Sequence, residues 1–191
     1  VDGVFASDQE VSDHPIQQEI MAPGYFKYRD MDGNRIINEN DKTYLGSPIP
    51  RLTGGLDFGF AWKNLDFGLT LYWQLGNKIL NAKRMNRDVF TDGNYDLDFY
   101  QNSWRPDRQS NTYPSAAAYN SAFVQQANSF FVEDASYFRI QNIQVGYTFR
   151  NLWKINMMRV YFSAQRPLTL FRYNGFTPEV GGSPIANGVD T

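Results

Sequence analysis

The sequence contains no cysteine, which excludes disulfide crosslinks, thiolate metal sites and a cysteine nucleophile. Its one histidine, His14, lies in the polar stretch SDHPIQQ, where a solvated loop residue is expected rather than a catalytic base. No apolar run approaches the roughly 18 residues that a membrane helix requires. The N-terminal stretch VDGVFASDQEVSD is acidic and lacks the apolar region of a signal peptide. The chain is therefore either soluble or meets a membrane by a route other than a helix.

An excess of charge of either sign is also missing. The 18 basic and 20 acidic residues give a net charge of −2, and the basic residues are scattered, so neither nucleic acid nor an anionic membrane surface is indicated as a partner. Aromatic residues are abundant at 16% of the chain, with 12 Tyr, 15 Phe and 4 Trp. Such residues favour strands and interfaces that have one wet and one apolar side.

Two pairs of segments alternate between apolar and polar residues and predict antiparallel hairpins. The first pair covers 51–62 (RLTGGLDFGFAW) and 65–75, joined by the turn Lys63–Asn64. The second covers 136–149 and 157–165, joined by a short turn around 150–156. The apolar parity of the third segment flips at Gln141, which indicates a β-bulge or a strand that runs past the end of its apolar environment. Arg166 and Pro167 are expected to end the apolar stripe of the fourth segment.

The connections are unequal in length, and this favours a transmembrane β-barrel. Both hairpin turns are short, whereas residues 76–135 form a connection of sixty residues. Barrels of the outer-membrane type combine short periplasmic turns with long external loops. Trp62 and Trp73 would then lie in the aromatic girdles. The polar strand residues would line a wet lumen: Asp57, Asp66, Gln144, Arg159 and Gln165. A soluble β-sandwich remains the alternative. Four strands cannot close a barrel, so the chain is expected to be one part of an assembly.

The predicted fold is therefore all-β, with antiparallel strands that form part of a transmembrane β-barrel with long external loops. The predicted division is an external loop at 1–50, barrel hairpins at 51–75 and 136–165, a long external loop at 76–135, and an external segment at 166–191.

The stretch DMDGNRIINEND at 30–41 has the spacing of a calcium-binding loop. Oxygen ligands would come from six positions: Asp30, Asp32, Asn34, the Ile36 carbonyl, Asn38 and Asp41. The position that is normally Gly is Arg35, which must adopt a positive φ if the loop turns as an EF-hand does. No helix is expected on either side. Two interpretations stay open: a weak calcium site of the extracellular kind, and a metal-free turn in which the Asp and Asn side chains accept backbone hydrogen bonds.

No catalytic arrangement is expected. Glu133–Asp134 and Asp96–Asp98 are adjacent carboxylates on loops, and such groups are more often solvated than catalytic. The long connection also carries four aromatic residues that are candidates for contact with a substrate or a lid protein: Tyr95, Tyr100, Trp104 and Tyr113. Packing within the loops is the alternative role for these rings.

Three motifs resemble the SusC/RagA-type TonB-dependent transporters, the large outer-membrane importers of Bacteroidetes. They are PGYFKYRDMDGNRIINENDKTYLGSPIPRLTGGLDFGF, FFVEDASYFRIQNIQVGYTF and VYFSAQRPLTLFRYNGFTPEVGG, and their order and spacing also match. The sequence departs from the family pattern at Tyr25, Ala135 and Arg166–Pro167.

The resemblance implies import of a bulky nutrient, a glycan or a peptide, through a barrel of the outer membrane. It also implies an N-terminal plug pulled by TonB, a SusD-like lipoprotein as lid, and a last strand that lies outside this chain. A soluble β-rich carbohydrate-binding module with a calcium-ordered loop is the alternative function. An enzyme is not expected.

Overall fold

The computed structural model describes residues 1–87, 96–119, 126–179 and 189–190, and the chain forms two compact units. The loop unit comprises Val1–Gly46, Leu80–Glu133 and Val189–Thr191, and the strand unit comprises Ser47–Ile79 and Asp134–Gly188. No helix in the described part of the chain has the length and hydropathy that a membrane span needs.

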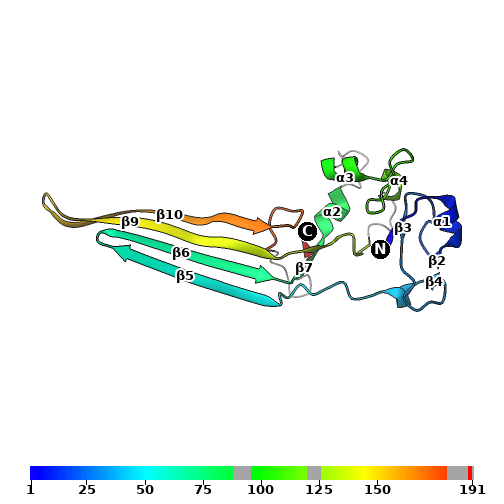
Figure 1. The fold of residues 1–191 in the computed structure, drawn as a ribbon, viewed down its shortest axis with the longest axis horizontal. Coiled ribbons are helices and arrows are strands. Elements are labelled where there is room, and N and C mark those ends of the chain that lie inside the picture. Colours follow the sequence, from blue (N-terminus) through cyan, green and yellow to red (C-terminus); the bar gives the residue numbers. More distant parts are fainter. Residues whose placement is uncertain (88–95, 120–125, 180–188, 191) are drawn as a thin grey trace. The chain divides into compact units, whose positions relative to one another are not determined.

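The strand unit is one antiparallel sheet of four long strands in the order β10-β9-β6-β5 (Figure 1). The strands are β5 (Leu52–Trp62), β6 (Leu65–Leu75), β9 (Tyr137–Leu152) and β10 (Ile155–Phe171). Tight turns at Lys63–Asn64 and Trp153–Lys154 close the two hairpins. Lys63 has a φ of +56°, which suits the twist of a two-residue hairpin turn.

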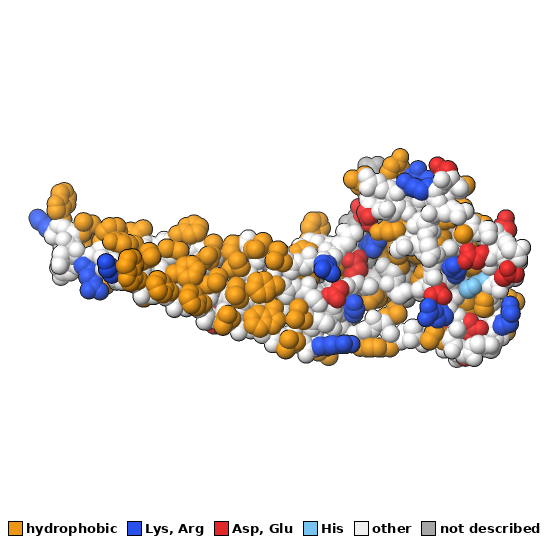
Figure 2. All heavy atoms as spheres, in the orientation of Figure 1, with side chains coloured by type: hydrophobic (Ala, Val, Ile, Leu, Met, Phe, Trp, Pro, Cys, Tyr) orange, Lys and Arg blue, Asp and Glu red, His pale blue; other side chains and the backbone are white. Residues whose placement is uncertain are grey.

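The register places every apolar stripe of the sequence on one face of this sheet. Phe60, Phe67, Val145 and Phe162 form one continuous row across the four strands. The exposed members of the face are between 36% (Leu65) and 70% (Phe162) accessible. Figure 2 shows hydrophobic side chains covering the long strands. A face of this kind must meet lipid or another apolar surface.

A β-bulge at Gln141 keeps the apolar parity consistent along β9. Thr70 pairs with Asn142 and Leu71 with Ile140, so Gln141 is the extra residue, and the first of the two interpretations of the parity flip is confirmed. The register between β9 and β10 shifts at the same place, between Gln165 and Leu168.

The expected end of the apolar stripe at Arg166–Pro167 is wrong, because β10 continues to Phe171. Pro167 has no N–H to donate to a ladder, but it lies in the irregular pair where the ladder is already interrupted. Arg166 absorbs the shift with a φ of +50°. Beyond it, Leu168 and Leu170 return to the apolar face opposite Ile140 and Phe138.

The loop unit is built from short elements around an aromatic core. Its first part holds β1 (Gly3–Val4), α1 (Asp8–Asp13), β2 (Ile16–Gln17), β3 (Phe26–Lys27), β4 (Ile36–Ile37) and the 3-10 helix η1 (Glu39–Asp41). Its second part holds α2 (Ala82–Arg87), α3 (Leu97–Asn102) and α4 (Ala116–Tyr119), and it also contains β11 (Val189–Asp190). Strands β7 (Lys78–Asn81) and β8 (Val132–Asp134) run across the boundary between the units in sequence.

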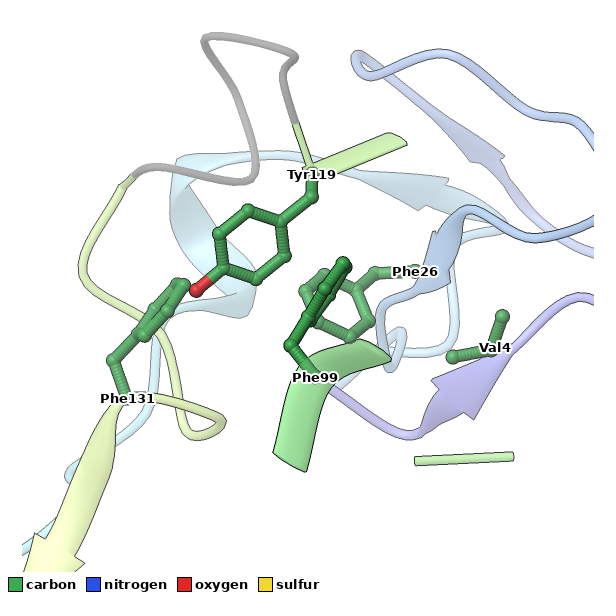
Figure 3. Packing of buried hydrophobic residues seen from close by; sticks show 5 residues of the cluster. All are labelled: Val4, Phe26, Phe99, Tyr119 and Phe131. Atoms are coloured by element: carbon green, nitrogen blue, oxygen red, sulfur yellow. The ribbon is translucent and has the colours of Figure 1, made fainter. Parts of the chain in front are cut away.

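Five buried side chains form the core of the loop unit, and they come from both parts of it (Figure 3): Val4, Phe26, Phe99, Tyr119 and Phe131. Next to these core residues in sequence, β1 pairs with β3 and β7 pairs with β8. Within the region predicted as a separate long loop, 76–135, Leu80–Glu133 thus belong to one unit with Val1–Gly46, which the predicted linear division did not anticipate. Whether these segments lie outside the cell stays a prediction.

Candidate functional site

The second face of the long sheet is polar and carries a concavity of 660 Å³ toward its loop end. Asp57, Thr70, Asn142 and Gln165 form one row of this face. The concavity is lined by side chains of all four strands and of the segment after β10, among them Asp57, Tyr72, Gln141, Arg166 and Glu179. The polar strand residues predicted to line a lumen therefore share one face.

One ion pair crosses this polar face near the hairpin-turn end of the sheet. Arg159 on β10 donates to both carboxylate oxygens of Asp66 on β6, with Nε–Oδ1 and Nη2–Oδ2 distances of 3.1 and 2.5 Å. Gly146 on β9 lies between them, and a Cβ there would come within 2.6 Å of Asp66 Oδ1 and 2.7 Å of Arg159 Nη2. The glycine thus leaves the space that the bidentate pair occupies.

A second polar cluster ties the segment after β10 to the sheet. The Arg139 side chain on β9 is only 4% exposed and forms an ion pair with Glu179. Arg139 Nε also donates to Thr169 Oγ1 at 3.0 Å, and Tyr137 Oη donates to Glu179 Oε1 at 3.2 Å. The Arg166 guanidinium lies 3.8 Å from the other carboxylate oxygen of Glu179.

Sequence reasoning did not single out Arg139 and Glu179, although each lies in one of the three motifs. Arg139 is in SYFRIQN and Glu179 is in FTPEVGG. The available signal was an arginine at a strand position and a Pro-Glu pair, but nothing in the sequence indicates that residues forty positions apart meet.

The Asp/Asn loop at 30–41 gathers three carboxylates. One ligand oxygen from each of Asp30, Asp32 and Asp41 lies within 4.8 Å of the others. Arg35 has a φ of +66°, as the calcium-loop interpretation requires of that position. Asn34 and Asn38 instead accept from backbone N–H groups of Ile36 and Asn40, and the Ile36 carbonyl accepts from Asn38 Nδ2 at 3.3 Å.

The carboxylates of this loop also satisfy backbone donors. Asp41 accepts from the N–H groups of Asn38 and Met31, both at 2.7 Å, and these bonds hold its pKa below the usual value. Desolvation tends to raise the pKa of Asp30, but hydrogen bonds from Arg35 N and Gly33 N outweigh it and leave that pKa lowered. Both carboxylates are therefore ionised and acceptor-only at neutral pH, which is the form that Ca²⁺ binds.

The four aromatic candidates for substrate or lid contact differ in their placement. Tyr95 lies outside the described residues. Tyr100 is 57% exposed, with the Arg105 guanidinium 4.8 Å from its ring centre. Trp104 and Tyr113 pack against the aromatic core, and Tyr113 Oη donates to Asp98 at 2.5 Å. Tyr100 is thus the described candidate whose ring is most available, and the contact role of all four stays a prediction.

Comparison with known proteins yields related receptors. No family model matches the chain. The chain is 32% identical to the TonB-dependent receptor SusC of Bacteroides thetaiotaomicron over 83% of its own length, and 30% identical to the TonB-dependent receptor P26 of Formosa agariphila over 76%. These matches cover 16% and 14% of the two receptors, so the chain spans about a sixth of their length.

The fold agrees with these matches. A structure of the RagAB peptide importer in the closed-closed state matches 87% of this chain and 19% of the solved chain, with a TM-score of 0.60 and 25% identity. A structure of the RagAB peptide transporter matches 76% of this chain and 16% of the solved chain, with a TM-score of 0.56 and 26% identity. These related proteins are receptors and transporters. Together with the open four-stranded sheet and its apolar outer face, they show that the chain belongs to the SusC/RagA-type TonB-dependent transporters, of which it contributes a barrel segment that does not close by itself.

Proposed function

We propose that this chain forms part of the barrel wall and loops of an outer-membrane importer of bulky nutrients, either a glycan or a peptide. The proposed partners are the rest of the barrel and its plug, a SusD-like lipoprotein, TonB and outer-membrane lipid. The observation that carries the proposal is the two-faced sheet: an apolar face suits lipid, and a polar face with a concavity suits a wet lumen.

A soluble carbohydrate-binding module is a weaker candidate. It would need a second apolar layer against the row of Phe60, Phe67, Val145 and Phe162, whereas Phe162 is 70% exposed. A soluble domain that leaves such a face open is prone to aggregate.

Deletion of the gene for the intact receptor in its host tests this function. We expect the receptor to fractionate with the outer membrane and to need detergent for extraction. The deletion strain should lose growth on either peptides or polysaccharides as the sole nutrient of that class, and the restored gene should return it. A receptor found in the soluble fraction, or unchanged growth on both nutrient classes, would contradict the proposal.

We also propose that the Asp30–Asp41 loop holds Ca²⁺, because its clustered carboxylates supply the hard oxygen ligands that this ion prefers. Asp30, Asp32 and Asp41 would hold the ion. Binding would be weak, with a dissociation constant of roughly 10⁻⁴ to 10⁻³ M, as in extracellular modules.

Substitution of Asp32 distinguishes an effect on metal binding from an effect on the structure of the loop. The Asp32 oxygens accept hydrogen bonds from Asn34 N and Nδ2, whereas Asp41 caps η1 and also accepts from Met31 N. We expect Asp32→Ala in the intact receptor to weaken calcium affinity at least about tenfold, in line with the loss of a charged ligand. Its thermal midpoint in EDTA should stay unchanged. Calorimetry that detects no calcium binding to the unmodified receptor at millimolar ion would refute the site.

A further inference from the structure

The β9–β10 hairpin extends well beyond its neighbour at the turn end of the sheet. Tyr147 pairs with Leu65, the first residue of β6, and Thr148 N donates to Asn64 O at 2.8 Å. Strand β9 then runs on to Leu152 without a partner from β6. Thr148 still contacts the neighbouring turn, so four residues, 149–152, carry the hairpin roughly 13 Å beyond it at about 3.3 Å per residue. Figure 1 shows the hairpin curving away from the line of β5 and β6 at this end.

The projecting tip combines exposed apolar side chains with positive charge. Residues 149–157 read FRNLWKINM and include no acidic residue. Met157 is 69% exposed and Ile155 49%. Arg150 and Lys154 have no ion-pair partner among the described residues. Two of the 18 basic residues, Arg150 and Lys154, thus lie among exposed apolar groups at this tip.

Trp153 at the turn cannot be explained by the needs of the fold. Its φ is +56°, the value that Lys63 has at the matching position of the other hairpin turn, and glycine would adopt this conformation at a lower cost than tryptophan. Its side chain is fully exposed, at 102% of the reference area, so it packs against nothing in the described chain. An indole held in this turn and directed outward points to a contact outside this chain.

The neighbouring turn repeats the same combination. Trp62 is 60% exposed, and Lys63 Nζ lies 4.7 Å from the centre of its ring. The stretch 60–65 (FAWKNL) also has no acidic residue. Tryptophan prefers the membrane interface, and basic side chains near it attract anionic headgroups.

We propose that the β9–β10 tip, residues Arg150–Lys154, binds the headgroups of anionic phospholipids in the leaflet at the turn side of the barrel. The inference rests on the proposed outer-membrane function. Trp153 enters the headgroup layer, and Arg150 and Lys154 pair with lipid phosphate. The tip thereby anchors the barrel at a point beyond the Lys63–Asn64 turn.

A depth-sensitive probe at the tip tests the site, because this chain contains no cysteine of its own. The intact receptor, freed of cysteines elsewhere, would carry Trp153→Cys labelled with an environment-sensitive fluorophore. It would be reconstituted in nanodiscs that contain spin-labelled phosphatidylglycerol or spin-labelled phosphatidylcholine. We expect quenching by both lipids and stronger quenching by phosphatidylglycerol. The double variant Arg150→Gln/Lys154→Gln should reduce this preference by up to about 30-fold, since each basic residue near an anionic surface contributes roughly a fivefold attraction.

Matched controls distinguish the possible failures. A probe at Phe162→Cys on the apolar face reports on the barrel itself, and the charge-matched variant Arg29→Gln/Lys42→Gln in the loop unit should leave the lipid preference unchanged. If the probe at 162 is quenched and the probe at 153 is not, the tip does not bind lipid, although the proposed function stands. Equal quenching at 153 by both lipids refutes an anionic site. No quenching at either position refutes the proposed function as well.

Discussion

Alanine in place of Glu179 should speed backbone amide exchange in residues 172–179 by roughly 30- to 150-fold, which corresponds to about 2–3 kcal/mol of local stability. Removal of this carboxylate leaves the guanidinium of Arg139, 4% exposed, buried without its counter-charge. Such uncompensated burial is more costly than loss of the pair as a whole. The expected cost is below the upper range for buried pairs because the Glu179 side chain is itself 37% exposed.

Arg166→Ala provides the matched control. Arg166 is also paired with Glu179, but it is 61% exposed and 3.8 Å away, so its loss should change the exchange rate less than about fivefold. Hydrogen exchange of the intact receptor, read by mass spectrometry, would compare the two variants. Equal effects of the two substitutions would show that the segment is not held by the Arg139–Glu179 pair.

Acid should weaken the same contact. The hydrogen bond from Arg139 outweighs desolvation and holds the pKa of Glu179 below its ordinary value of 4.5. A carboxyl whose folded-state pKa is lowered contributes stability that is present above the unfolded value and is lost as the pH falls through the folded value. The contact therefore contributes its full stability at neutral pH, and the hydrogen exchange of the two variants should be compared at that pH.

The strand pattern was predictable because it depends on local periodicity. Alternation of period two located both hairpins, and the parity flip at Gln141 marked an irregularity, either a bulge or the end of the apolar environment, before any partner strand was known. The positive φ of Arg35 was likewise predictable from the spacing of its loop. In each case the information lies within a dozen residues.

Features that depend on distant contacts were not predictable. Strand β10 passes through Arg166–Pro167 because the opposing bulge at Gln141 removes the need for a Pro167 donor. The region after Gly76 reads as a loop because its buried residues, from Phe99 onward, pack on Val4 and Phe26, which lie more than seventy residues before Phe99. Neither partner leaves a periodic signal in the segment itself.

The two faces of β10 give the second large effect. Phe162→Arg should cost about 2–4 kcal/mol, because an arginine on the lipid face near the bilayer midplane is destabilising by that amount. Ser163→Arg, one residue further along the strand, should cost far less, because Ser163 pairs with Gln144 on the polar face and a wet lumen can hydrate the new charge. Phe162 and Ser163 lie near the middle of β10 and are both exposed, so the variants differ chiefly in the face that carries the charge.

The free energy of unfolding of the intact receptor in lipid vesicles, measured by guanidinium titration for these two variants, tests the barrel assignment most directly. The predicted result is a loss of about 2–4 kcal/mol for Phe162→Arg and little change for Ser163→Arg. Equal losses, or a greater loss for Ser163→Arg, would contradict the assignment of the apolar face to lipid.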